Sequence, residues 1–396
     1  MQITTLDYND YQGRIGIGRV FRGQLRRADR LAIVKRDGSI ETFTAKQLFI
    51  FEGLERKEVN SVPCGDICAI VGAENIHIGD TVCEAEHPEP LPIIAVDEPT
   101  ISMTFLTNNS PFYGREGQYV TSRQLRDRLL KELQHNVALR VEETHSPDRF
   151  KVSGRGLLHL SILIENMRRE GYELQVGQPR VIYREVDGRK MEPIEILVVE
   201  VPQPFAGKVI ELVGQRRGEM ITMEQKGNTT HLEFHIPTRG LKGLRSRLLT
   251  ATSGEAIMHH RFYQYEYFKG TITQRQTGVL ISMGTGPATA YAIDSLQERG
   301  RFFIKPGEVV YQGQIVGEHV KEGDLEVNVQ REKKLTNMRA AGSDKAARII
   351  PAIELSLEEA LEFINDDELV EVTPKSIRLR KIHLDPNERK RAKKAG

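Results

Sequence analysis

Short apolar runs separated by glycine dominate the first quarter of the chain. Three of them, 13–25, 30–38 and 65–72, carry clustered or alternating aliphatic residues with no helical period. Runs of this length and spacing are typical of the short strands of a small closed β-barrel. The proline-rich stretch 87–92 can continue neither a helix nor a central strand, so it is expected to be a linker. We therefore predict a β-barrel domain over 1–92.

The pattern then changes to strand, helix, strand, strand, helix, strand. Thr121 and Gln124 form a T-x-x-Q capping box in front of leucines at helical spacing, and a second amphipathic helix follows over 160–167. This order is that of a ferredoxin-like domain, an open sheet with helices on one face. We predict such a domain over 93–186.

The same order of elements recurs directly afterwards. A strand over 194–201 and a helix over 205–215 precede a hairpin that turns at Gly227 and Asn228, and a further helix and a long strand complete the set. A second ferredoxin-like domain is therefore predicted over 187–272.

The last part of the chain, 273–396, is β-rich as far as Val329 and then becomes strongly charged. It contains one well-marked helix, in which Ser356 and Glu359 form an S-x-x-E capping box before an apolar periodic run. The tail from Lys375 onward is basic, and we expect it to fray. The predicted fold class is thus multidomain β and α+β.

Charge is distributed unevenly, although the formal net charge of the 396 residues is only +1. The segment 331–348 holds six basic and two acidic residues, 349–374 holds eight acidic and no basic residues, and 375–396 holds nine basic and two acidic residues. Contact with nucleic acid depends on local cations that neutralise phosphates and needs no basic protein as a whole.

The segment 331–348, the basic segment, has almost no apolar content and cannot build a core. A solvated surface loop is the plainest interpretation of such a charge run taken alone. Polar residues and Gly342 among the cations also suit a loop that wraps phosphates, which makes RNA the expected partner. The candidate RNA-binding residues are Lys333, Lys334, Asn337, Arg339, Lys345 and Arg348.

Two further groups of cations are candidates for RNA contact. Arg378, Arg380 and Lys381 follow one another along a predicted strand, where some would face RNA and others solvent. Arg216 and Arg217 come after the first helix of the second ferredoxin-like domain, and ordinary surface charge explains them nearly as well.

Familiar catalytic chemistry is missing from the sequence. There is no phosphate loop, no H-E-x-x-H and no G-x-S-x-G motif, so we expect no catalytic residue. Three cysteines make no disulfide framework, and Cys64 and Cys68 lack a second ligand pair at zinc spacing, so no metal site is expected. No apolar run approaches the roughly 20 residues of a membrane span. We expect a monomeric cytoplasmic protein that binds no membrane.

Several long stretches carry a family resemblance. Residues 7–23 resemble the start of the β-barrel that follows the GTPase domain in elongation factors, and 153–171 resemble the third domain of elongation factor G. Residues 205–220 and 244–254 are similar to its fifth domain, and 333–339 with 357–374 look like the domain peculiar to the TypA/BipA family. The whole chain therefore resembles the C-terminal part of a TypA/BipA translational GTPase.

That resemblance implies a function. It implies the ribosome-docking part of a factor in ribosome function or large-subunit assembly under stress, with both subunits, 23S rRNA, the A-site region and the tRNA acceptor end as partners. It also implies GTP hydrolysis with Mg²⁺ in an N-terminal domain that this chain lacks, so we expect a truncated fragment that holds no cofactor and is not an enzyme by itself.

Two other classes of function remain open at this point. A non-ribosomal protein-interaction scaffold would use the basic segment for an acidic partner. An enzyme with an unrecognised site would need a nucleophile and base, and the sequence offers no such pair.

Overall fold

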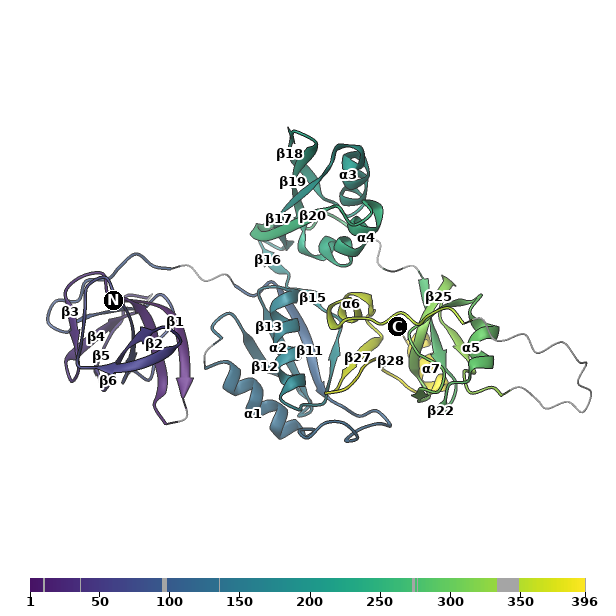
Figure 1. Ribbon diagram of the computed structural model, residues 1–396, viewed down its shortest axis with the longest axis horizontal. Coiled ribbons are helices and arrows are strands. Elements are labelled where there is room, and N and C mark those ends of the chain that lie inside the picture. Colours follow the sequence, from purple (N-terminus) through teal and green to yellow (C-terminus); the bar gives the residue numbers. More distant parts are fainter. Residues whose placement is uncertain are drawn as a thin grey trace, which may run out of the picture. The chain divides into compact units, whose positions relative to one another are not determined.

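A computed structural model of the protein describes residues 1–9, 11–35, 37–94, 98–134, 136–272, 275, 277–332 and 349–395. These residues form two compact units, Met1–Pro99 with Arg126–Glu142, and Thr100–Leu125 with Glu143–Gly396. Strands outnumber helices in both (Figure 1). The β-rich multidomain class predicted from the sequence is therefore confirmed at this coarse level.

The first unit is built on one antiparallel sheet of short strands. Its strand order is β5-β4-β10-β1-β2-β9-β6-β7, and β3 pairs with β8 in a separate ribbon. The strands are β1 (Gln2–Asn9), β2 (Gly13–Arg19), β3 (Gln24–Arg26), β4 (Arg30–Val34), β5 (Ile40–Thr44), β6 (Gln47–Glu52), β7 (Glu55–Val59), β8 (Ser61–Pro63), β9 (Ile67–Val71) and β10 (Thr81–Glu84).

The prediction of a closed barrel for this region is wrong, because the strand pairing gives an open sheet. Among the described residues, no hydrogen-bonded pair joins the two end strands β5 and β7. Both end strands are almost wholly exposed, and β7 carries Glu55, Arg56, Lys57 and Glu58 in succession. The sheet stays open around a core that includes Ile3, Leu48 and Ile76, and each end strand adds only one partly buried residue to it, Phe43 from β5 and Val59 from β7.

The six elements predicted after the linker occur in the predicted order. They are β11 (Ile101–Thr107), α1 (Ser122–Glu132), β12 (Arg140–Glu143), β13 (Arg149–Gly154), α2 (Leu157–Arg169) and β14 (Leu174–Gly177). The division between the two compact units falls inside α1 and β12.

Both predicted helix signals in this stretch are confirmed. The Thr121 N–H donates to Gln124 Oε1 (3.1 Å), and the Gln124 N–H donates to Thr121 Oγ1 (3.3 Å), which completes a capping box. The predicted apolar positions of α2, from Leu160 to Met167, are buried. Local spacing alone was enough to place these helices.

A long sheet in the second unit joins parts of the chain that are distant in sequence. Its order is β13-β11-β14-β27-β28-β25-β21-β26, and the β14–β27 pairing sets Leu174 opposite Val372. The later strands are β21 (Thr277–Ser282), β25 (Gln314–Glu322), β26 (Leu325–Val327), β27 (Glu368–Val372) and β28 (Ile377–Lys381), with β15 (Arg180–Val181) on β11 and β23 (Gly300–Phe302) on β25. The sheet thus continues across the predicted limits 186/187 and 272/273.

A second α/β body lies between those limits. Its sheet runs β20-β17-β19-β18, both helices pack on one face through a shared apolar core, and Gly227 makes the predicted hairpin turn at a φ of 65°. The elements are β16 (Arg184–Val186), β17 (Arg189–Pro202), α3 (Ala206–Gly214), β18 (Glu219–Lys226), β19 (Thr229–Pro237), α4 (Leu244–Ala251) and β20 (Ile257–Tyr267), with 3-10 turns at Gln203–Phe205 and Thr238–Leu241.

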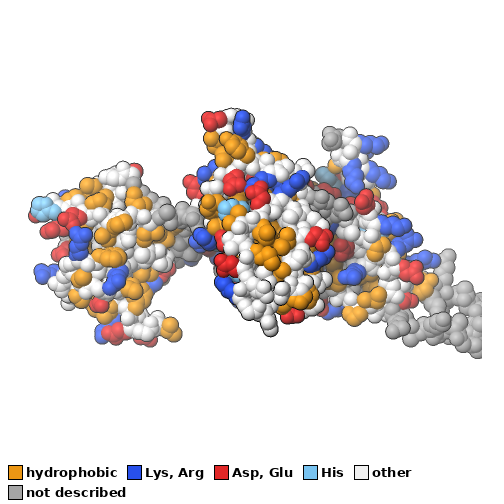
Figure 2. Space-filling view, turned by 90° about the horizontal axis from the view of Figure 1, so that it is seen from above, with side chains coloured by type: hydrophobic (Ala, Val, Ile, Leu, Met, Phe, Trp, Pro, Cys, Tyr) orange, Lys and Arg blue, Asp and Glu red, His pale blue; other side chains and the backbone are white. Residues whose placement is uncertain are grey.

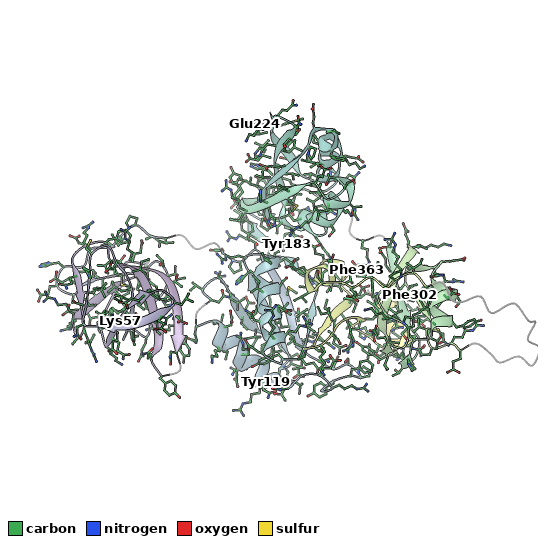
Figure 3. The ribbon with its side chains drawn as sticks, viewed as in Figure 1. Lys57, Tyr119, Tyr183, Glu224, Phe302 and Phe363 are labelled. Carbon is green, nitrogen blue, oxygen red and sulfur yellow. The ribbon has the colours of Figure 1, made fainter. Side chains whose placement is uncertain are left out.

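The C-terminal body contains three helices within the described residues. The predicted capping box of Ser356 and Glu359 starts α6 (Leu357–Phe363), which ends at Phe363, labelled in Figure 3. The Phe363 ring packs edge-on against Phe303 at a centroid distance of 5.3 Å. The helix α5 (Ala290–Leu296) and a ribbon of β22 (Gly286–Pro287) with β24 (Val309–Val310) were not predicted.

The expectation of a frayed tail is wrong. Residues after Lys375 form β28 in the long sheet and then α7 (Pro386–Ala395). The Asp385 carboxylate accepts from the N–H groups of Asn387 (2.7 Å) and Glu388 (3.2 Å), and Pro386 occupies the first helical position. These start signals outweigh the high charge of the tail.

The long sheet is held at its middle by a buried carboxylate. Glu371 of β27 is fully buried and accepts hydrogen bonds from Tyr311 Oη (2.6 Å), Ser110 Oγ (2.9 Å) and Asn108 Nδ2 (3.1 Å). Arg378 of β28 adds an ion pair at 3.4 Å. Burial, together with the charge of Glu371, raises the pKa of Tyr311 well above 10, so its hydroxyl remains a donor.

Replacement of Glu371 by glutamine should therefore destabilise the second unit by about 3 kcal/mol, because Arg378 loses a buried counter-charge and one of the two acceptor oxygens becomes an NH2 group that faces other donors. Thermal unfolding by calorimetry measures this loss. Glu354→Gln is the matched control, since Glu354 pairs with Lys305 on an exposed surface, and it should leave the transition in place. Equal unfolding temperatures for the two variants would contradict the assignment.

A second pair, of which only the carboxylate is buried, joins two strands of the α/β body. His260 Nδ1 of β20 is 2.5 Å from Glu195 Oε2 of β17, and Glu195 is buried. The hydrogen bond to Glu195 and the charge of that carboxylate raise the pKa of His260 above 6.5 despite partial burial. The folded state therefore binds a proton more tightly than the unfolded chain does.

The stabilisation from this pair should be fully present below about pH 6.5, the unfolded-state pKa, and should disappear as the pH rises through the raised folded-state pKa. Thermal unfolding of the wild type and of His260→Gln from pH 5.5 to pH 9 tests this. The difference in unfolding temperature between the wild type and His260→Gln should become smaller as the pH rises. A difference that stays constant with pH would show that protonation of His260 does not contribute to stability.

Candidate nucleic-acid interface

The cations predicted in the basic segment lie mostly outside the described residues. Lys333, Lys334, Asn337, Arg339, Lys345 and Arg348 all fall in 333–348, so their RNA contacts stay predictions. The structure does describe the residues on either side, Arg331 and Glu332 before and Ile349 onward after. These two ends show which part of the protein carries the segment.

The described residues on both sides of the basic segment are attached to the body that contains α5. On one side the Arg331 carbonyl accepts from Thr289 Oγ1 (2.6 Å), and the Arg331 guanidinium lies 6.0 Å from the Tyr291 ring centroid. On the other side Ile349 packs against the apolar core of this body, and the Ile353 N–H donates to the Phe302 carbonyl (2.8 Å). The basic segment therefore leaves and rejoins the protein at one ordered base.

The helix α5 owes its position to its own N-terminus. Thr289 caps it by accepting from the Ala292 N–H (3.1 Å), while its backbone N–H donates to the Val329 carbonyl (2.8 Å). Ala292 and Ile293 then face the core. A single threonine thus contacts the start of α5, the turn that follows β26 and the first residue of the basic segment.

The three cations predicted on β28 are interior residues, which corrects their assignment to RNA. Arg380 and Lys381 are each only 2% exposed. Arg378 is bonded to Glu116 and Glu371, so its guanidinium is already neutralised. Phosphate groups cannot reach side chains that are withdrawn from solvent and occupied by carboxylates.

Each interior cation has its own acceptors. Arg380 donates to Asn109 Oδ1 (2.7 Å) and to two backbone carbonyls. The Lys381 ammonium lies 2.8 Å from both Asp324 and Asp367 and 2.9 Å from Glu368. Burial opposes the charge of Lys381, but the carboxylates, Glu368 foremost, outweigh it and raise the pKa of the ammonium.

Arg216 and Arg217 do not form the phosphate-binding doublet that the sequence suggested. Arg216 Nη1 donates to the carbonyls of Gly240 (2.7 Å) and Lys242 (2.5 Å), and burial lowers its pKa to about 10. Arg216 therefore has a structural role, in which it holds the backbone at Gly240 and Lys242. Arg217 is exposed at a φ of 63°, and its contact with RNA stays a prediction.

Sequence reasoning missed the cations of α7. Arg389 is anchored by Glu326 of β26 (2.9 Å) and by the carbonyls of His383 and Leu384. The remaining cations of the helix are exposed, and no ion pair is found for them among the described residues; they are Lys390, Arg391, Lys393 and Lys394. The Asp-Pro helix start was the signal that could have identified this basic face.

The anchor of the α7 helix is close in sequence to Arg331, the first residue of the basic segment. Glu326, which holds Arg389, lies five residues before Arg331, so the anchor and the start of the basic segment are at most ~18 Å apart along an extended chain. Figure 2 shows exposed Lys and Arg side chains on the C-terminal body at the right of the view. Such local cations can neutralise phosphates in a protein with little net charge.

No helix among the described residues is long and apolar enough to cross a membrane. Family models match three stretches of the chain. The elongation factor Tu domain 2 model matches 13–83, the elongation factor G C-terminus model matches 189–276, and the TypA/BipA C-terminal domain model matches 277–386.

Long relatives match the chain from end to end. It is 50% identical over 395 residues to the large ribosomal subunit assembly factor BipA of Bacillus subtilis (strain 168), which covers 99% of this chain and 64% of that protein. It is 51% identical over 397 residues to the protein of the same name from Escherichia coli (strain K12), which covers 100% and 65%.

The chain thus spans about 65% of the length of these relatives. The match to the TypA/BipA C-terminal domain covers the body that carries the basic segment and α7. The chain belongs to the TypA/BipA family of the elongation factor G superfamily and corresponds to the C-terminal part of its members.

Proposed function

We propose that this chain is the ribosome-docking, RNA-binding portion of a TypA/BipA protein that acts in large-subunit assembly or ribosome function, under stress. The observation that carries the proposal is the basic segment, whose two ends are fastened at one ordered base around α5. The relatives' name, large ribosomal subunit assembly factor, supports a ribosomal target.

The expected partners follow from this role. They are 23S rRNA near the A-site region, both ribosomal subunits and the acceptor end of tRNA, met by a monomer in the cytoplasm. The domain limits 1–92, 93–186, 187–272 and 273–396, and the ferredoxin-like character of the middle two, belong to the same proposal.

GTP hydrolysis is assigned elsewhere. The sequence has no phosphate loop, so we place GTP and Mg²⁺ in a GTPase domain of the parent protein and not in this chain. The part of the parent protein that this chain represents is proposed to act as a binding module.

Phosphate contacts should dominate the affinity. Apart from Tyr291 at its base, the basic segment has no aromatic residue on which bases could stack, so charge and shape remain. Each phosphate neutralised by a cation releases counterions, which makes binding fall steeply with salt.

The triple replacement by alanine of Lys333, Lys334 and Arg339 should weaken ribosome binding. It should also reduce the slope of log affinity against log salt concentration by roughly two to three, about one for each lost phosphate contact. Sedimentation with purified large subunits at several salt concentrations measures both quantities. The control is Lys208→Ala, because that ammonium is already paired with Glu211. Unchanged affinity and slope would remove the basic segment from the interface.

The α7 helix gives an independent expectation. Alanine at Lys390, Arg391, Lys393 and Lys394 should lower the same slope by roughly one to three and leave the unfolding temperature unchanged, since these side chains are exposed. Arg389 is retained, because it anchors the helix to Glu326. A loss of affinity without a change in slope would mean that α7 contacts protein and not RNA.

A non-ribosomal scaffold is the competing class. It predicts that the fragment stays in the supernatant when ribosomes are pelleted and that nuclease treatment of the ribosomes changes nothing. Co-sedimentation that is lost after nuclease treatment favours the ribosomal role.

A further inference from the structure

The strand β20 is an open edge of the second α/β body. It pairs with β17 from Ile257 to Tyr267, and among the described residues no strand pairs with its other side. In an antiparallel sheet every second residue of an edge strand turns its N–H and C=O away from its neighbour. This edge therefore offers a row of backbone donors and acceptors, which is the template for strand addition.

The usable part of this edge has a definite length. The pairing with β17 is interrupted at Tyr263, where β20 carries one extra residue, and a bulge of this kind bends the strand away. The run before it, Ile257–Phe262, is regular and contains no proline. It can pair with about six residues of an extended chain.

A depression with a mixed polar and apolar lining adjoins the start of this run. It has a volume of ≈330 Å³ and lies between Arg245, Leu248 and Leu249 of α4 and the stretch Ala256–His259. Ile257 on its rim is 54% exposed, which is unusual for isoleucine in a strand. An apolar side chain of an added strand can fill this space, because alternate side chains of a strand point to the same side.

The charge around the edge has one dominant sign. Arg245 and Arg247 of α4 and Arg261 of β20 are exposed, and no ion pair is found for them among the described residues. The acidic exceptions are Glu255, just before the strand, and Glu195 of β17, which is bonded to His260. A partner strand that carries carboxylates would complement these guanidinium groups.

We propose that Ile257–Phe262 binds an extended acidic segment of another protein as an added β-strand, with one apolar side chain in the depression beside α4. This site is separate from the RNA contacts proposed above. Protein fits better than RNA here, because an extended peptide can pair with the open backbone edge of β20 and a phosphate backbone cannot. A second copy fits less well, because its Arg261 would meet the same cations.

A defined probe tests the proposal on the full chain. The probe is an acetylated, amidated peptide, Glu-Leu-Glu-Val-Asp-Val-Glu, with a fluorescent label, followed by anisotropy at low salt. Binding should slow hydrogen exchange of backbone amides in Ile257–Phe262. The same peptide N-methylated at alternate residues should bind at least tenfold more weakly, because it cannot form the backbone ladder.

Charge reversal supplies the protein-side test. Arg245→Glu with Arg261→Glu should weaken binding of the probe about tenfold at low salt and less at high salt. The matched control is Lys226→Glu, at the far edge strand β18, near Glu224 in Figure 3, and it should bind the probe normally. Unchanged unfolding temperatures for both variants show that the fold is intact.

Four results would overturn the proposal. They are equal binding of the N-methylated probe, exchange protection outside Ile257–Phe262, displacement of the probe by a uridine decanucleotide that protects the same amides, and a dimer in sedimentation that Arg261→Glu dissolves. The third result would make the edge an RNA site, and the fourth would make it a self-association surface.

Discussion

The carboxylate of Glu371 is withdrawn from water, and its hydrogen-bond donors come from parts of the chain that are far apart in sequence. Asn108 and Ser110 precede α1, Tyr311 belongs to the C-terminal body, and Arg378 lies on the next strand. A buried carboxylate is tolerated only when it is surrounded by donors. The long sheet can therefore form only when all of these segments meet, which makes this carboxylate the constraint that fixes how the larger unit is assembled.

Burial of charge also separates two kinds of cation that look alike in the sequence. The cations of β28 neutralise acidic residues of β27 and its neighbours inside the protein, whereas the cations of α7 beyond Arg389 face solvent. Only eight residues separate Lys381 from Lys390 along the chain. The strongly acidic stretch before β28 thus supplies the counter-charges of the interior, and the cations beyond it are left available for an external polyanion.

Features that depend on neighbours in sequence could be predicted. The capping boxes at Thr121 and Ser356, the apolar face of α2 and the turn at Gly227 are all set by residues within four positions of one another. The order of elements in both α/β regions followed from the same periodicities.

Features that depend on partners distant in the chain could not be predicted from the sequence. Arg380 and Lys381 can be buried because Asn109 and Asp324 accept their hydrogen bonds. No local sequence pattern predicts these distant partners. The open sheet of the first unit reflects the exposure of its end strands, which a list of short strands does not reveal. For the candidate interface, composition identified the basic segment, while α7 was overlooked because its charge concealed a clear Asp-Pro helix start.

The pairing of β14 with β27 has a consequence for synthesis of the protein. Leu174 pairs with Val372, which is translated about 200 residues later. At ordinary rates of elongation this delay is roughly 10–40 s. During that interval β14 is the uncovered border of a nascent sheet. The growing chain must therefore pass through a stage in which this border is exposed to other strands.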